Sequence, residues 1–124
     1  MQKQKMNVKG APSSAPFLEN NTITVLMADT FLTRFAGLMF RKKLPAATGL
    51  FLAPCNSVHM CFMRFAIDVV YLDKDYKILK IVTNLKPWIG LSICRKAWAT
   101  LELTAGEAER CGFAVGKKLI RKES

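Results

Sequence analysis

One short stretch, CNSVHMCFMRFAIDVVYLD at residues 55–73, holds the side chains that could do chemistry. It contains the single histidine, His59, with a cysteine on either side, and one acid, Asp68, inside an apolar run. If the strands on the two sides of the RFA turn pair, His59 could meet Asp68. A carboxylate beside an imidazole fixes its tautomer and raises its pKa. Such a pair suits acid/base chemistry or polar recognition, and equally a structural hydrogen bond between two strands.

Metal binding and cysteine catalysis are two further chemistries that the spacing does not favour. Zinc needs thiolate or imidazole ligands in a tetrahedral arrangement. Alternate residues on a strand lie about 6.6–7 Å apart, too far for two ligands of one zinc, and Pro54 argues against Cys55 lying on the same strand as His59. No cysteine is marked by a helix start or a known local motif. We therefore expect no metal and no cofactor, and thiols that pack as small hydrophobic groups; they belong to Cys55, Cys61, Cys94 and Cys111.

Three arginines near this stretch suggest an anion site. Arg34 and Arg41 flank a GLM turn, and Arg64 lies in the central stretch at 55–73. The planar guanidinium fork matches carboxylate and phosphate groups, so we expect a small anionic ligand or a protein partner. The structural alternative is that each arginine pairs with an acid, such as Asp68, Asp73 or Glu102. The candidate polar site is Arg34, Arg41, His59, Arg64 and Asp68.

Apolar side chains offer a second candidate surface. Methionine and aromatic residues are favoured on adaptable binding surfaces, although most of them are simply core. Trp88 is the best candidate, because it lies in the segment KPWIGLSICRK at 86–96, which reads as an irregular loop, and loops often carry function. The candidate apolar groove is Met39, Met63 and Trp88.

Composition and charge limit the class of protein. The 124 residues include 19 basic and 9 acidic side chains, which gives a net charge of +10. This length is most economically one domain with its own core. The basic residues come in short separate groups, so nucleic-acid binding is a weaker hypothesis than the charge alone suggests. We find no signal peptide and no membrane span, and expect a cytoplasmic protein with reduced thiols.

The order of the expected elements predicts an α+β fold. Residues 1–21 read as a flexible basic lead, residues 22–120 as a single globular domain, and residues 121–124 as a short basic tail. Apolar positions at helical spacing predict a short helix at 29–41, and a capping pattern from Thr104 to Glu107, with Gly112 as a stop, predicts a second. We expect a mostly antiparallel, curved, barrel-like sheet with these two short helices. Its strands are expected at 22–28, 49–54, 57–63, 67–73, 77–85, 97–103 and 117–120.

Three blocks of the chain resemble a known prokaryotic family, the domain of unknown function 192. They are RFAGLMFRKKL, then GLFLAPCNSVHMCFMRFAIDVVYLD, then LELTAGEAERCGFAVGKKL, and the resemblance as a whole covers roughly Thr22 to Ile120. Two departures from the family pattern are visible, since Ala66 stands where a proline is usual and Lys117 where an acid is usual. The resemblance implies a compact, β-rich single domain. It implies no activity, because none is established for the family as a whole.

These observations leave three hypotheses about function open. The first is a non-enzymatic binding or accessory module with an Arg/His/Asp polar site. The second is a small hydrolase-like enzyme that uses His59 and Asp68. The third, nucleic-acid binding, rests on net charge alone. Whether the chain is an enzyme stays open.

Overall fold

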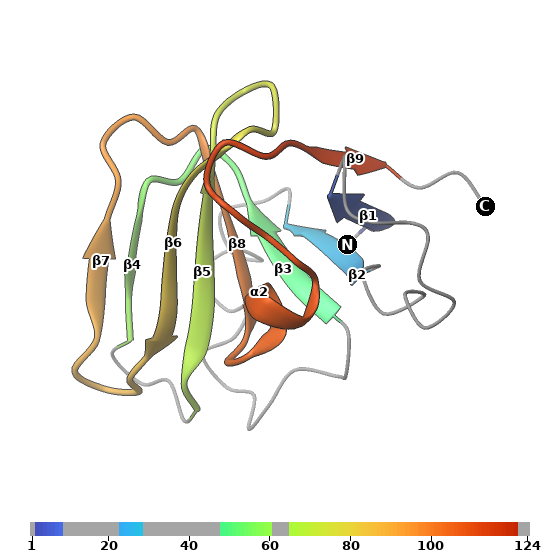
Figure 1. The fold of residues 1–124 in the computed structure, drawn as a ribbon. Helices are drawn as coiled ribbons and strands as arrows, with labels where there is room; N and C mark the ends of the chain where they lie inside the picture. Colours follow the sequence, from blue (N-terminus) through green and yellow to red (C-terminus); the bar gives the residue numbers. More distant parts are fainter. Residues whose placement is uncertain (1, 9–22, 29–47, 61–64, 122–124) are drawn as a thin grey trace.

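The computed structural model describes residues 2–8, 23–28, 48–60 and 65–121 of the chain. These residues form a small, mostly β domain with one short helix (Figure 1). The elements, in chain order, are β1 (Gln2–Val8), β2 (Ile23–Ala28), β3 (Thr48–Leu52), β4 (Ser57–His59), β5 (Ile67–Leu72), β6 (Ile78–Leu85), β7 (Leu91–Ile93), β8 (Ala99–Thr104), α2 (Glu107–Arg110) and β9 (Leu119–Arg121).

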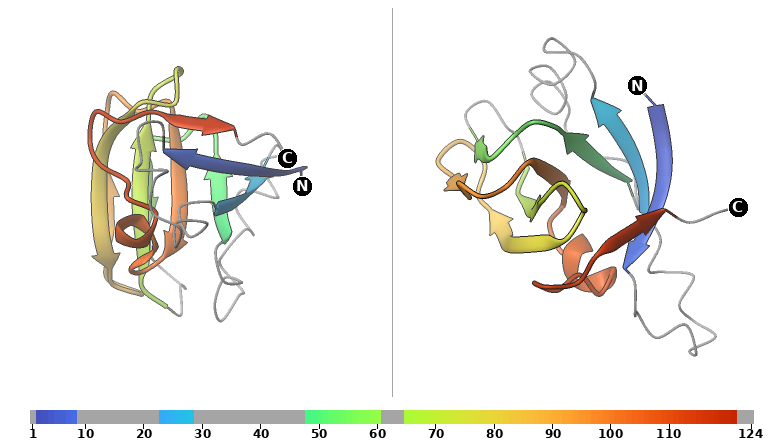
Figure 2. Two further views of the ribbon diagram at one scale, coloured as in Figure 1. Left: turned by 45° about the vertical axis from the view of Figure 1, so that its right-hand side comes forward. Right: turned by 90° about the horizontal axis from the view of Figure 1, so that it is seen from above.

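The strands form two sheets. The larger has the order β6-β5-β8-β3-β2-β1-β9, and the smaller pairs β4 with β7. All these pairs are antiparallel except β2 with β3. The large sheet is strongly twisted, so that β1 and β9 run at a steep angle to β5, β6 and β8 (Figure 2). The antiparallel β-rich prediction is therefore confirmed, but the described strands do not close into a barrel, because β6 and β9 end the sheet.

Strand β5 separates two hydrophobic cores. All six residues of IDVVYL are buried, as expected for a strand that is covered on both faces. Val70 and Leu72 face a first core with α2 and the segment around Phe113. Ile67, Val69 and Tyr71 face a second core against the β4–β7 sheet. This alternation brings different polar side chains of β5 and β8 to the two faces.

The predicted C-terminal helix is present but begins differently. Its N-cap is Gly106, with φ of 96° and no side-chain cap, so the expected cap from Thr104 is wrong. Glu107 instead pairs with Arg110, with 2.7 Å between Oε2 and Nη2. Gly112 follows the helix with φ of 71°, in the left-handed region expected of a helix stop. The helix expected at 29–41 lies outside the described residues.

The β5–β6 hairpin confirms the sequence pattern. Its KDY turn is held by Asp73, whose Oδ1 accepts the N–H groups of Asp75 (2.8 Å) and Lys77 (3.0 Å). Strand β7, in contrast, lies in a segment that the sequence predicted as an irregular loop. Within the expected lead, Gln2–Val8 forms β1, which pairs with β2 and β9. The division of the chain into lead, domain and tail stays a prediction.

Candidate functional site

Asp68 is the best described member of the candidate polar site. It is fully buried on β5, on the face of the first core. Its Oδ1 accepts the N–H of Asn84 at 2.9 Å. Its Oδ2 accepts the N–H groups of Gly106 and Ala108, each at 3.0 Å. One carboxylate therefore joins β5, β6 and the start of α2.

The backbone around Asp68 explains why a carboxylate is needed there. Ile67 pairs with Leu85 but Val69 pairs with Val82, so β6 carries one extra residue in a bulge. Asn84 lies in that bulge with φ of 54°, and its N–H would have no strand partner without Asp68. The start of α2 likewise exposes N–H groups that Gly106 has no side chain to cap. These contacts favour the structural hydrogen-bond reading of Asp68 over the acid/base reading.

The structure does not bring the whole predicted polar site together. His59 lies on β4 opposite Leu91, but its side chain is outside the described part. The other members, Arg34, Arg41 and Arg64, lie outside the described residues, as do Met39 and Met63 of the apolar groove. The predicted site and groove therefore stay predictions.

Trp88 lies on the surface, in the loop before β7. It is 56% exposed, and its backbone has φ of 68°, which is rare for a residue with a side chain. The backbone N–H of Trp88 donates to the carbonyl oxygen of Met60 at 2.8 Å. The loop thus holds the backbone of Trp88 in one conformation at the surface.

A group of polar side chains, of which the sequence reasoning named only Glu102, lies in the second core. Tyr71 and Thr100 are fully buried and directly opposite each other on β5 and β8. Glu102 follows two residues along β8, and Ser92 points inward from β7. The hydroxyl oxygens of Tyr71, Ser92 and Thr100 make no hydrogen bond within the described residues. We call these four residues the interior polar cluster.

Burial dominates the electrostatics of the interior polar cluster. It raises the pKa of Glu102 to about 7, and no cation or hydrogen bond among the described residues acts against it. It also raises the pKa of Tyr71. The nearby Ser92 hydroxyl lowers the pKa of that phenol, although the two oxygens do not meet in good hydrogen-bond geometry. Cys55, Cys94 and Glu102 raise it further, which places both thiols near the phenol.

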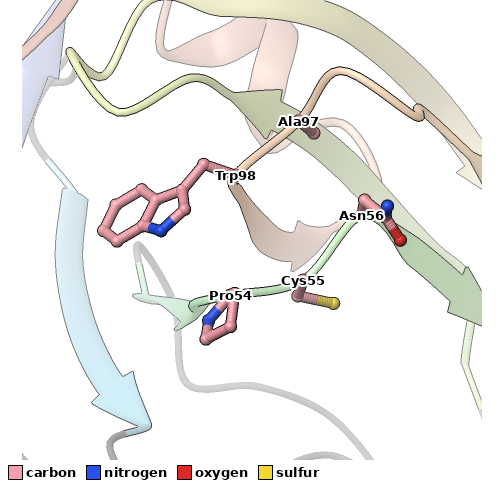
Figure 3. Close-up of a pocket in the computed structure, with 5 residues that line it drawn as sticks. All are labelled: Pro54, Cys55, Asn56, Ala97 and Trp98. Atoms are coloured by element: carbon pink, nitrogen blue, oxygen red, sulfur yellow. The ribbon is translucent and has the colours of Figure 1, made fainter.

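A pocket of about 230 Å³ lies at the margin of the second core, since two of its lining residues, Cys55 and Ala97, pack against that core. Pro54, Cys55 and Asn56 line it from one segment, and Ala97 and Trp98 from another (Figure 3). The N–H of Cys55 donates to the carbonyl of Trp98 at 2.9 Å and ties the two segments together. Cys55 lines the pocket, packs against the second core and raises the pKa of the Tyr71 phenol. Together with Ala97, which also packs against the second core, Cys55 connects the pocket to the core that holds the interior polar cluster.

The described part of the chain shows neither a metal-binding group of side chains nor a membrane-spanning helix. It contains no group of three or more histidine, cysteine, aspartate or glutamate side chains that could hold a metal ion. None of its helices has the length and hydropathy of a membrane span.

The thiol of Cys111 is buried in the first core, and burial raises its pKa to about 11. At neutral pH this thiol is protonated and packs as a small hydrophobic group.

The sequence contained a signal for the interior polar cluster, but only in combination with the strand order. In TLEL, Thr100 and Glu102 alternate with leucines, which usually indicates that the polar residues face solvent. Strand β8 instead pairs with β3 and β5 and is covered on both faces, so its polar residues are buried. Placing β8 in the centre of the sheet would have identified them.

Comparisons with known proteins give a consistent picture. The sequence profile of the family described as "Uncharacterized ACR" (DUF192) matches residues 16–120. A UPF0127 protein of Pyrococcus furiosus is 39% identical over 102 residues, which are 78% of this chain and 85% of the relative. A UPF0127 protein of Pyrococcus horikoshii is 41% identical over 69 residues, 52% of this chain and 57% of the relative.

Two solved structures share the fold. A proposed transcription regulator of Sinorhizobium meliloti 1021 has a TM-score of 0.80 at 22% identity, over 97% of this chain and 94% of that one. A protein of unknown function from Novosphingobium aromaticivorans has a TM-score of 0.76 at 23% identity, over 97% and 86%. At this identity the likeness describes the fold and not the activity.

Proposed function

We propose that this chain, which belongs to the uncharacterised DUF192 family, is a non-enzymatic binding module for a small polar molecule. The ligand would enter at the pocket beside Cys55 and Trp98 and reach the interior polar cluster. One observation carries the proposal: within the described residues, the buried hydroxyl groups of Tyr71, Ser92 and Thr100 have no hydrogen-bond partner.

The energetics explain why such a cluster calls for a ligand. A buried polar group without a partner costs roughly 1–3 kcal/mol. Three such hydroxyls would consume a large part of the roughly 5–15 kcal/mol by which a domain is stable. Native proteins therefore keep few of them, and those they keep contact water or ligands.

The chemistry of the cluster indicates the kind of ligand. Hydroxyl groups donate and accept, whereas an ionised carboxylate only accepts. A ligand with an ammonium or guanidinium group would satisfy Glu102, and it would lower the pKa that burial has raised. The anionic ligand expected from Arg34, Arg41 and Arg64 is a separate proposal, because it rests on residues outside the described part.

An NMR titration with methylammonium and methylguanidinium chloride tests this proposal. We expect the amide resonances of Tyr71 and Thr100 to shift in a saturable way. The affinity obtained from these shifts should be at least about tenfold lower in Glu102→Gln, which removes the charge but keeps the shape of the side chain. Glu109→Gln, on an exposed helix position, is the matched control and should bind as the unmodified protein does. The absence of saturable shifts, or equal binding by both variants, would contradict the proposed site.

The hydrolase hypothesis has less support. The Asp68 carboxylate already accepts three backbone N–H groups, and the side chain of His59 is not described. Glu102 fits the role of acid or base better, because a pKa of about 7 suits proton transfer at neutral pH. Hydrolysis of p-nitrophenyl acetate or phosphate that disappears in Glu102→Gln, and persists in Glu109→Gln, would favour an enzyme.

Nucleic-acid binding remains the third hypothesis. Its support is the net charge of +10. It requires an affinity for duplex DNA that falls steeply with salt.

A further inference from the structure

We propose that the outer face of β7 and the loop before it form a docking surface for an acidic protein segment in extended conformation. We call this set the β7 surface: Trp88, Ile89, Leu91 and Ile93. It is separate from the interior polar cluster, and its partner is a macromolecule instead of a small ligand.

The first support is the exposure of these side chains. Trp88 is 56% exposed, Ile89 80%, Leu91 74% and Ile93 52%. Single exposed apolar side chains are common, but four within six positions concentrate exposed apolar surface in one segment, and such a concentration is typical of an interaction site.

The orientation of β7 is the second support. Ser92 points into the second core and is only 8% exposed, while its apolar neighbours Leu91 and Ile93 point outward. A strand that covers a core normally turns its apolar residues inward and its polar residues to water. The reversed pattern makes sense if the outer face is covered by a partner.

The loop before β7 holds the patch in one conformation. The N–H of Gly90 donates to the carbonyl of Lys86 at 3.0 Å, and the N–H of Trp88 donates to the carbonyl of Met60 at 2.8 Å. A Cβ at Gly90 would lie 2.6 Å from that Lys86 oxygen, so only glycine fits. A surface fixed in advance loses less conformational freedom on binding.

Charge indicates the chemistry of the partner. The segment from Tyr76 to Leu101 contains no acid, and four of its bases are exposed close to the β7 surface in the chain: Lys80, Lys86, Arg95 and Lys96. The Nζ of Lys80 donates to the carbonyl of Ile93 at 3.0 Å, which places that ammonium at the edge of β7. Basic flanks favour an acidic partner. They disfavour a second copy of this chain, which carries the same positive charge.

Spacing indicates the conformation of the partner. Leu91 and Ile93 occupy alternate positions of β7, and alternate residues of a strand lie about 6.6–7 Å apart. An extended segment with apolar residues at every second position matches that spacing. The carbonyl oxygen of Ile93 already accepts a hydrogen bond from Lys80. We therefore expect the partner to contact the side chains on the outer face of β7 instead of its backbone.

The experiment uses the full chain and an acetylated peptide in which glutamate alternates with valine. Fluorescence of the exposed Trp88 and NMR shifts of 86–96 should report saturable binding that weakens with salt. The double variant Leu91→Ser, Ile93→Ser should bind at least about tenfold more weakly, since two apolar contacts are lost. Val115→Ser is the matched control, because Val115 is also exposed (64%) but lies outside the β7 surface.

Three outcomes would overturn the proposal. One is equal binding by the double variant and the control variant. The second is equal binding of a peptide with lysine in place of glutamate, which would remove the charge argument. The third is binding of phosphatidylglycerol vesicles with no binding of the acidic peptide, which would make the surface a membrane contact. Folding of each variant is checked by its NMR spectrum.

Discussion

The carboxylate of Asp68 should be one of the most important single side chains for the stability of this fold. The variant Asp68→Asn keeps the size of the side chain but removes its charge and one of its two acceptor oxygens. At least one of the three N–H groups of Asn84, Gly106 and Ala108 then loses its acceptor and faces an amide NH₂.

The magnitude follows from the three bonds. A hydrogen bond to a charged group contributes about 1.5–3 kcal/mol and a neutral one about 0.5–1.5 kcal/mol. Losing one charged bond and weakening two others sums to roughly 4 kcal/mol. This is a large fraction of the roughly 5–15 kcal/mol expected for a whole domain. We therefore expect Asp68→Asn to unfold at a much lower urea concentration than the unmodified protein.

Urea unfolding followed by circular dichroism measures this free energy. The matched control is Asp75→Asn in the β5–β6 turn, which removes an exposed charge and should change stability by less than about 0.5 kcal/mol. Hydrogen exchange gives a local readout, because the amides of Asn84, Gly106 and Ala108 should lose protection first. A loss below about 1 kcal/mol in Asp68→Asn, with those amides still protected, would refute the structural role.

Three further predictions concern the interior polar cluster and the β7 loop. Burial raises the pKa of Glu102 from 4.5 to about 7, so the folded state holds this proton more tightly than the unfolded state, and stability should fall by up to about 3 kcal/mol as pH rises from 4.5 to 7. This pH dependence, measured by urea unfolding, should be absent from Glu102→Gln. Thr100→Val removes a buried hydroxyl that has no partner among the described residues, so the melting temperature of the ligand-free protein should stay the same or rise, and a clear fall would contradict our assignment. Gly90→Ala should cost about 2 kcal/mol in urea unfolding, because its Cβ would lie 2.6 Å from the carbonyl of Lys86. Gly112→Ala is the comparison, because a Cβ at Gly112 would have no atom within 4 Å and only the positive φ of 71° opposes it. It should cost about 1 kcal/mol, and equal losses of stability in the two variants would show that the close contact at Gly90 is not the cause.

Local patterns predicted much of the fold. The β5–β6 hairpin and the short helix α2 came from features that act over a few residues, such as the KDY turn and the stop at Gly112. Strand β7 was missed because Pro87 and Gly90 mark a loop. Its inward Ser92 and outward Leu91 also reverse the usual alternation. Strand β4 is only Ser57–His59 within a longer predicted run, parts of which lie outside the described residues.

The candidate site was harder to predict because it depends on pairs that are distant in the chain. Asp68 was predicted as a member of the polar site, with a structural hydrogen bond as the alternative, but its partners Asn84, Gly106 and Ala108 arise from a bulge and a helix start that no local pattern specifies. Glu102 was considered only as an ion-pair partner. Its burial follows from the position of β8 between β3 and β5.

That central position of β8 also has a consequence for the folding rate of the chain. Phe51 on β3 pairs with Leu101, and Val70 on β5 pairs with the same residue on its other side. During synthesis, two fully buried apolar strands therefore leave the ribosome before the strand that joins them. Pairing over such long separations makes folding slow. Until Ala99–Thr104 has been made, the edges of β3 and β5 that face it are unpaired and prone to aggregation, so an early stop in translation should yield an insoluble fragment.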